Sequence, residues 1–261
     1  MKNNIYIILI SLLTLTSCEK VINVNLNDSS PQYVIEATVT NTGAPARVKI
    51  TRSVNFDQNN SFPGVDGAIV HITDGDGRIY HLLEVAPGDY QQDTLIGIEG
   101  MTYNLEIDVN GHVFTSASTM PQMVQLDSLV FQNSAGFQKR IVPQVVFNDP
   151  PNVVNYYNFV VQINGVYDKN IIALNDNLSD GLTIHRSLRT DTDIAAGDMV
   201  TVELQCINTG AYTFFSSLDK VSGGGMSGGT PGNPITNIVG GALGYFSAYT
   251  SDVKSAIAPK L

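Results

Sequence analysis

The stretch TYNLEIDVNGHVFTSAS, residues 102–118, decides the fold, because two runs of alternating apolar and polar residues flank the dipeptide Asn110-Gly111. Alternation with a period of two is typical of a strand with one buried face. Asn-Gly readily supplies the two positive φ angles that a tight hairpin turn needs. The stretch therefore predicts two antiparallel strands, Thr102 to Val109 and His112 to Ser118, joined by a two-residue turn.

Runs of the same kind precede and follow this hairpin. Upstream, the expected strands are Tyr33 to Thr40, Ala46 to Ser53, Ala68 to Thr73, Arg78 to Glu84 and Gly88 to Asp93. Downstream, they are Val124 to Phe131, Ile141 to Asn148, Asn155 to Asn164, Val166 to Leu174, Leu182 to Leu188 and Met199 to Ile207. The chain is therefore expected to be all-β and mainly antiparallel. Met120-Pro121 separates the two series, so we expect two β-sandwich-like domains in tandem, residues 31–120 and 121–261.

One segment of the C-terminal domain departs from this period. Apolar residues recur at every third position between Ala211 and Val221, which predicts a helix there, with Thr209 as its N-cap and Gly223 able to end it. The stripe expected to pack against the sheet consists of Tyr212, Phe215, Leu218 and Val221. Residues 222–234 are too rich in Gly and Pro for regular structure and are expected to form a loop.

The N-terminal residues predict a lipid anchor. The apolar run from Ile5 to Leu15 is far shorter than the ~20 residues that a membrane-spanning helix needs. Leu15-Thr16-Ser17-Cys18 matches the cleavage and lipidation site of a bacterial lipoprotein. We therefore expect residues 1–17 to be a signal peptide and Cys18 to carry the acyl chains that hold the protein in a lipid bilayer. Residues 18–30 are expected to form a tether, with an edge strand over Ile22 to Leu26 as the open alternative.

The charge of the chain excludes one class of partner. The 14 Lys and Arg residues face 24 Asp and Glu residues, a formal net charge of −10, so a phosphate backbone would be repelled and nucleic acid is not an expected partner. Cys206 has no cysteine to pair with once Cys18 is acylated. Its alternation with Val202 and Leu204 predicts that Cys206 is buried as a small apolar side chain.

Patterns that resemble catalytic or metal sites are incomplete. Ser227 lies in a sequence that matches a nucleophile elbow, but no His follows it along the chain. Asp74 opens a sequence like a calcium loop, which Arg78 interrupts. A second group of acids lacks the glycine of such a loop and comprises Asp191, Asp193 and Asp198. We expect these acids in turns, and we expect no catalytic residue and no cofactor.

Two indications of binding remain. His71 and His81 lie on strands that we expect to pair, as weak candidates for a metal site. They face each other if the turn is Gly75 to Gly77, whereas a two-residue turn places them on opposite faces. The second indication is a loop that mixes amides with two aromatic rings, which a solvated loop does not need. This contact loop comprises Asn55, Phe56, Asp57, Asn59, Asn60 and Phe62.

Short segments along nearly the whole chain occur in a specific order and spacing. They are Cys18 to Ile22, Tyr33 to Ala37, Thr51 to Phe56, Gly67 to Ile72, Pro87 to Tyr90, Ser118 to Pro121, Leu126 to Leu129 and Gly240 to Tyr249. Together they resemble a family of Bacteroidetes-type outer-membrane lipoproteins catalogued as a domain of unknown function, number four-two-four-nine. We expect a transthyretin- or immunoglobulin-like first domain, and the resemblance implies one similar to the transthyretin-like or carboxypeptidase-regulatory sandwiches. It also implies a TonB-dependent transporter as companion. It implies no known activity and no catalytic residues.

The expected function is that of a non-enzymatic accessory or binding lipoprotein beside a TonB-dependent nutrient transporter, with a glycan or peptide as a possible ligand. Two alternatives stay open: an envelope hydrolase with a site assembled from distant residues, and a structural or adhesion module. Glu19, after Cys18, differs from the Asp that retains some lipoproteins in the inner membrane. The expected location is therefore the outer membrane, with the cell surface favoured over the periplasmic face.

Overall fold

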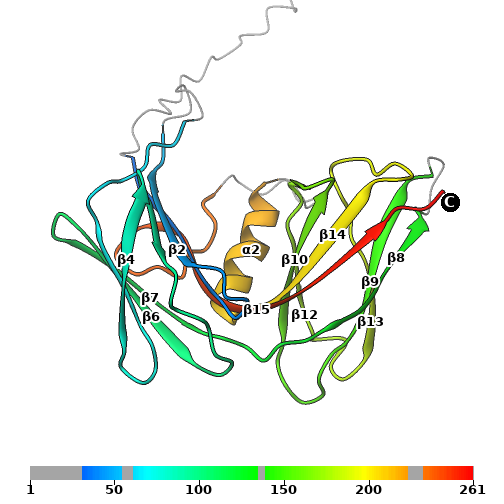
Figure 1. Cartoon of the computed structure of the whole chain (residues 1–261), viewed down its shortest axis with the longest axis horizontal. Coiled ribbons are helices and arrows are strands. Elements are labelled where there is room, and N and C mark those ends of the chain that lie inside the picture. The colour runs from blue at the N-terminus through cyan, green and yellow to red at the C-terminus, as the bar shows by residue number, and fades with distance from the viewer. Residues whose placement is uncertain (1–30, 55–60, 135–138, 223–231, 261) are drawn as a thin grey trace, which may run out of the picture.

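A computed structural model of the chain describes residues 31–54, 61–134, 139–222 and 232–260. Within these residues the chain forms fifteen strands and one helix, α2 (Thr209–Val221), which confirms the all-β class. Figure 1 shows two lobes with α2 between them. We call the one on the left the N-terminal lobe and the one on the right the C-terminal lobe.

The N-terminal lobe contains the first seven strands. They are β1 (Tyr33–Thr40), β2 (Ala46–Arg52), β3 (Ile69–Thr73), β4 (Ile79–Ala86), β5 (Asp89–Gln92), β6 (Thr102–Val109) and β7 (His112–Thr119). Asn110 and Gly111 have φ angles of 54° and 84° and join β6 to β7 with Val109 opposite His112, as the sequence predicts. The strands follow the order β1-β2-β5-β4-β3-β6-β7 around one core, to which alternate residues contribute, such as Ile35, Ile72 and Ile107.

The C-terminal lobe places two sheets around a second core. Its strands are β8 (Leu126–Asn133), β9 (Ile141–Asn148), β10 (Tyr156–Ile163), β11 (Val166–Tyr167), β12 (Ile172–Asn175), β13 (Thr183–Ser187) and β14 (Met199–Cys206). One sheet has the order β13-β9-β8, and β10 and β14 belong to the other. The core contains Phe147 and Val145 from the first sheet and Phe159 and Leu204 from the second.

The single strand expected from Val166 to Leu174 is wrong, because the structure has two short strands there, β11 and β12. Asp168 lies in the irregular segment between them and accepts backbone hydrogen bonds from Asn170 at 3.0 Å, Asp191 at 3.1 Å and Thr192 at 3.0 Å. An Asp side chain that satisfies backbone N–H groups stabilises a turn in place of a continuous strand.

The longest strand, β15 (Leu243–Ile257), was not predicted from the sequence. Its first half pairs in parallel with β1, from Leu243 opposite Val34 to Tyr249 opposite Thr40. Its second half pairs antiparallel with β14, and Figure 1 shows the strand running beneath α2 to the C-terminal lobe. The lobes therefore share one 12-stranded sheet.

This strand also corrects the expected domain boundary. The division at residue 120 assigns everything after it to the C-terminal domain. The segment that leads into β15 and its first half nevertheless pack in the N-terminal core, to which they contribute Ile238, Ala242, Phe246 and Ala248. The N-terminal lobe is therefore completed by residues near the other end of the chain.

Helix α2 differs from its prediction in its cap and its buried face. Asn208, and not Thr209, is the N-cap, and its Oδ1 accepts a hydrogen bond from the backbone N–H of Ala211 at 2.9 Å. The buried residues are Ala211 and Phe214, so the predicted stripe is not the buried face. Tyr212, a member of that stripe, lies beside the buried face and stacks on Tyr156. Among the described residues, no helix has the length and hydropathy to cross a membrane.

Candidate functional site

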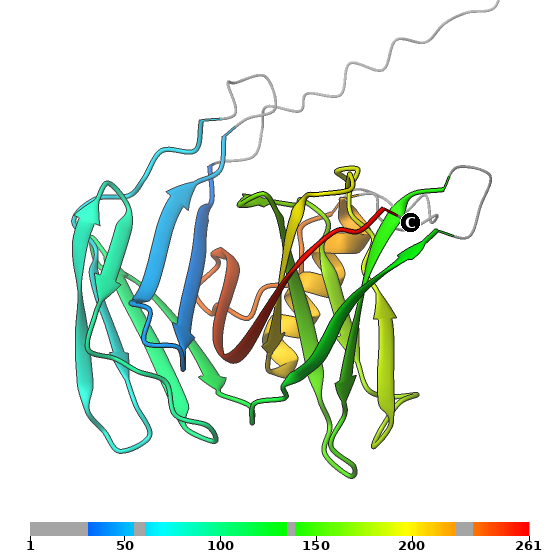
Figure 2. The same cartoon turned by 45° about the vertical axis from the view of Figure 1, so that its right-hand side comes forward.

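The flanks of the expected contact loop lie at the end of the N-terminal lobe where the described chain begins. The backbone N–H of Ser53 donates to the carbonyl of Gln32 at 2.8 Å, and the N–H of Gln32 donates to Ser53 Oγ at 2.9 Å. Figures 1 and 2 both place the start of β1 and the flanks of residues 55–60 at this end. Asn55, Phe56, Asp57, Asn59 and Asn60 lie outside the described residues, whereas Phe62 is described and is 56 % exposed.

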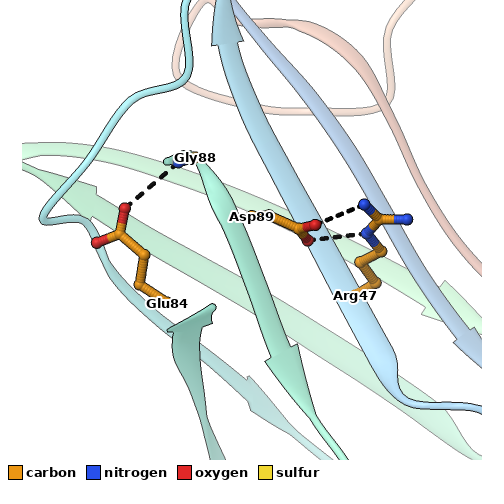
Figure 3. Close-up of polar contacts among 4 residues, drawn as sticks. All are labelled: Arg47, Glu84, Gly88 and Asp89. Atoms are coloured by element: carbon orange, nitrogen blue, oxygen red, sulfur yellow. Dashed lines mark hydrogen bonds and ion pairs between the residues drawn. The ribbon is translucent and has the colours of Figure 1, made fainter. Parts of the chain in front are cut away.

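The chain that returns from this loop is held by Glu84 and Tyr90. The Glu84 carboxylate accepts hydrogen bonds from the N–H of Gly67 at 3.0 Å and of Gly88 at 3.3 Å, the second of which is drawn in Figure 3. The bond from Gly67 is the main cause that lowers the pKa of Glu84. The Tyr90 hydroxyl accepts a hydrogen bond from the N–H of Ala68 at 2.9 Å. The loop therefore leaves from a fixed base.

An ion pair joins β2 to β5 on the same lobe. Arg47 donates from Nε to Asp89 Oδ1 at 2.8 Å and from a terminal nitrogen to Oδ2 at 2.5 Å, the fork drawn in Figure 3. Hydrogen bonding raises the pKa of Arg47 and lowers that of Asp89. The Arg47 side chain is 53 % exposed, so solvent screens the charges and the pair contributes little to the free energy of unfolding. We interpret it as a strand-to-strand contact.

The structure decides between the two alternatives for the histidines. His71 and His81 lie directly opposite each other on β3 and β4, with ring centroids 6.0 Å apart. Strand β3 lies between β4 and β6, and Glu106 of β6 is the residue directly opposite His71 on that second neighbour. Its Oε1 is 3.8 Å from His71 Nε2. A hollow of about 380 Å³ adjoins this row, and His71, Glu106 and Thr115 are among the residues that line it.

Two of the acids that resembled calcium loops, Asp74 and Asp198, serve as turn caps. Asp74 Oδ1 accepts hydrogen bonds from the N–H of Asp76 at 3.1 Å and of Arg78 at 2.9 Å. Asp198 accepts a hydrogen bond from the N–H of Ala195 at 2.7 Å. These two acids therefore lie in turns, as the sequence predicts.

A larger hollow of about 1050 Å³ opens in the C-terminal lobe. Charged side chains from several elements line it: Arg140, Arg186, Arg189, Asp191, Asp193 and Asp219. Arg140 pairs with Asp193, with 3.3 Å between Nε and Oδ1. Within the described ranges, the guanidinium groups of Arg186 and Arg189 have no ion-pair partner. The hollow therefore presents groups of both charges to a polar ligand.

Three carboxylates also converge in the C-terminal lobe. One oxygen each from Asp149, Asp176 and Asp180 lies within 4.8 Å of the other two, and Asp149 and Asp176 are buried. Asp149 accepts hydrogen bonds from the Tyr157 hydroxyl and from the N–H of Gly181, the latter at 3.1 Å. These bonds fasten neighbouring loops, and the cluster lines neither of the two hollows described above. We therefore interpret it as structural.

Cys206 is buried, as its alternation predicts. Its side chain is 2 % exposed, burial raises the pKa of the thiol, and Sγ accepts a hydrogen bond from the N–H of Val124 at 3.3 Å. An inaccessible thiol with a raised pKa is a poor nucleophile. Cys18 and Ser227 lie outside the described residues.

The match to a known family extends over both lobes. A family described as a domain of unknown function, DUF4249, matches residues 19–255. The chain belongs to this family. The DUF4249 match includes most of β15, so the region that defines the family contains the strand shared by the lobes. No curated protein matches the chain.

Sequence reasoning missed two sets of residues in this DUF4249 chain. Glu106 carried no signal, because its position opposite His71 depends on how β3 pairs with β6. The charged residues of the larger hollow come from β13, from α2, from the segment before β9 and from the loop after β13; of these, only Asp191 and Asp193 were singled out in the sequence, as turn residues. The scarcity of arginine was a partial signal in the sequence. The chain has six arginines, and the structure shows that three of them, Arg140, Arg186 and Arg189, line that hollow.

Proposed function

We propose that this DUF4249 chain is a non-enzymatic accessory lipoprotein that is held in the outer membrane by Cys18 and binds a TonB-dependent nutrient transporter. The observation that carries the proposal is the double hydrogen bond between Gln32 and Ser53. Because the described chain begins beside the flanks of the contact loop, a tether over residues 18–30 would join the N-terminal lobe at the same end as that loop. An extended tether of residues 18–30 spans at most about 45 Å, which keeps this end close to the bilayer.

The surface at this end suits a protein partner. Phe62 exposes a large apolar side chain, and the segment that follows it is held by Glu84 and Tyr90. Aromatic residues on a fixed base are typical of the centre of a protein interface, because little conformational entropy is lost on binding. The proposed contact is therefore the contact loop against the transporter.

Co-purification tests this proposal. The full-length lipoprotein is solubilised from outer membranes in detergent and captured, and we expect a transporter to accompany it. Phe62→Ala is expected to lower recovery of the transporter several-fold, because interface aromatic residues carry much of the binding energy. Leu178→Ala is the matched control, because Leu178 is 97 % exposed in a loop of the other lobe. Repeated recovery of the lipoprotein alone would contradict the proposal.

Protease treatment of intact cells tests the side of the membrane. Cleavage of the chain in intact cells supports a location on the cell surface, and protection until the cells are opened supports the periplasmic face.

The alternative of an envelope hydrolase would be favoured by a deep hollow with converging acids. The larger hollow is lined by Asp191, Asp193 and Asp219 together with three arginines, of which Arg140 pairs with Asp193. The cluster of Asp149, Asp176 and Asp180 does not line it.

A further inference from the structure

The row of His81, His71 and Glu106 crosses three neighbouring strands of the N-terminal lobe. His81 of β4 lies opposite His71 of β3, which lies opposite Glu106 of β6. Directly opposite residues of antiparallel strands project from the same face, with Cβ atoms about 4.5–5.5 Å apart. From this juxtaposition we infer that the three side chains bind a divalent transition-metal ion. The inference goes beyond the proposed function and does not depend on it.

The chemistry of the row matches such an ion. Two imidazole nitrogens and one carboxylate oxygen form a ligand set that zinc accepts in open, three-ligand sites. Imidazole ligands favour zinc, copper or nickel over the hard ions calcium and magnesium, which prefer oxygen. The acid cluster of the C-terminal lobe offers oxygen atoms alone and so presents a different class of ligand.

The three ligand atoms do not yet all lie within 4.8 Å of one another, so the site requires rotation of side chains, above all of His81. Zinc bonds of about 2.0–2.1 Å place tetrahedral ligand atoms roughly 3.3 Å apart. His71 Nε2 and Glu106 Oε1 are already 3.8 Å apart. The rings of His71 and His81 are 6.0 Å apart between centroids, and His81 is exposed, so its ring is free to turn toward the ion.

The backbone beneath the row is fixed. Val70 and Ile72 flank His71 on β3 and point into the core, where they are 2 % and 0 % exposed. Val70 lies opposite Leu82, which is also buried. A ligand set on rigid strands keeps its spacing better than one on loops. The metal-binding geometry therefore depends on rotation of three side chains, of which His81 and Glu106 are exposed and His71 is half-buried, and not on refolding of the sheet.

The fourth coordination position has room. The hollow of about 380 Å³ is lined by His71 and Glu106 and also by Thr73, Asn104 and Thr115. These polar groups offer hydrogen bonds to a water molecule or a small ligand on the metal. No Lys or Arg lines this hollow, so no cationic side chain there opposes the ion.

Zinc titration tests the inference. The full chain, purified in detergent without a histidine tag, is titrated with Zn²⁺ by calorimetry, and Co²⁺ spectra report the geometry. We expect one ion per chain, with binding weakened about tenfold or more by His81→Ala and by Glu106→Gln. His185→Ala is the matched control, because His185 is an exposed histidine on β13 of the other lobe, and it should leave binding unchanged.

Two results would overturn the inference. One is the absence of zinc binding, or binding that His81→Ala weakens no more than His185→Ala does. The other is binding that survives His81→Ala and is lost in Asp180→Asn, which would assign the ion to the acid cluster. Because His81 and Asp180 are both exposed, neither variant should disturb the core, and the circular dichroism spectrum checks that each remains folded.

Discussion

At Gly244 the backbone of β15 lies close against the backbone of β1. Its φ is +104°, and a Cβ atom there would lie 2.9 Å from the backbone nitrogen of Ile35 and closer still to its carbonyl. Gly241, three residues earlier, has a φ of +88° with open space around it. Both positions favour glycine by conformation, but only Gly244 is also required by packing. The parallel pairing of β15 with β1 therefore depends on a missing side chain.

Replacing each glycine by alanine separates these two effects. Gly241→Ala is expected to lower the free energy of unfolding by about 1–2 kcal/mol, through the positive φ alone. Gly244→Ala should lower it by about 3–5 kcal/mol, because backbone overlap with Ile35 adds to that strain. Urea unfolding of both variants measures the difference. Equal losses would show that β15 can move away from β1 without cost.

Glu84 supports the base of the contact loop in a pH-dependent way. Hydrogen bonds lower its pKa in the folded state below the ordinary value of 4.5. Its contribution is therefore fully present above pH 4.5 and is lost as the pH falls through the lowered pKa. We expect the N–H of Gly67 to lose protection from hydrogen exchange in acid, relative to Gly77, whose N–H donates to the carbonyl of Asp74.

Glu84→Gln is the variant that checks this assignment. The uncharged amide keeps the size of the side chain but no longer titrates, so the relative protection of Gly67 should become independent of pH. Gly77 supplies the reference at every pH, which removes the intrinsic pH dependence of exchange. An unchanged pH profile in Glu84→Gln would show that another group holds the segment.

Among the elements, α2 shows how a local signal is completed by tertiary contacts. Asn208 Oδ1 caps the helix, and Asn208 Nδ2 donates to Ser118 Oγ at 2.8 Å. The same Ser118 Oγ accepts a hydrogen bond from the N–H of Ala248 at 2.7 Å. The cap thus connects α2, β7 and β15. Asn208 and Thr209 are both suitable cap residues by type, and the contact with Ser118 accompanies the use of Asn208.

The two capping candidates are distinguishable by mutation. Asn208→Ala should lower the free energy of unfolding by about 1–2 kcal/mol, because the N-cap bond is lost. Thr209→Ala, at an exposed neighbour, should change it by less than about 0.5 kcal/mol. Thermal or urea unfolding measures both values. A larger loss for Thr209→Ala than for Asn208→Ala would show that Thr209 is the N-cap, as the sequence predicts.

For the whole molecule, the shared sheet makes each lobe depend on the other. Phe246 of β15 is 0 % exposed in the N-terminal core, while the second half of the same strand pairs with β14. Unfolding of one lobe would leave half of β15 without its partner strand. Exposed strand edges and lost burial are both unfavourable, so the two lobes should unfold together.

Calorimetry of two core variants tests this coupling. Phe246→Ala removes a buried ring from the N-terminal lobe, and Leu204→Ala removes a buried side chain from the C-terminal lobe. Each is expected to cost about 3–5 kcal/mol and to shift one common unfolding transition. Val253→Ala, at a half-exposed position of β15, is the control. Two resolved transitions, of which Phe246→Ala lowers only one, would show that the lobes are independent.

Strands whose signals are local could be read from the chain alone. The strands β1, β6 and β9 have the predicted bounds, because alternation and turn residues act between near neighbours in sequence. Burial of Cys206 followed from the same alternation. The helix was found as well, although its buried face was assigned to the wrong residues.

Pairing between distant segments was decided only in three dimensions. Glycines interrupt the start of β15, and Phe246, Ser247 and Ala248 are all buried, so its first half has no simple alternation. The row of His71, His81 and Glu106 and the lining of the larger hollow likewise depend on strand register. Local sequence specifies which face of a strand is apolar, whereas the partner of that strand is selected by core packing and by close backbone approach, as at Gly244.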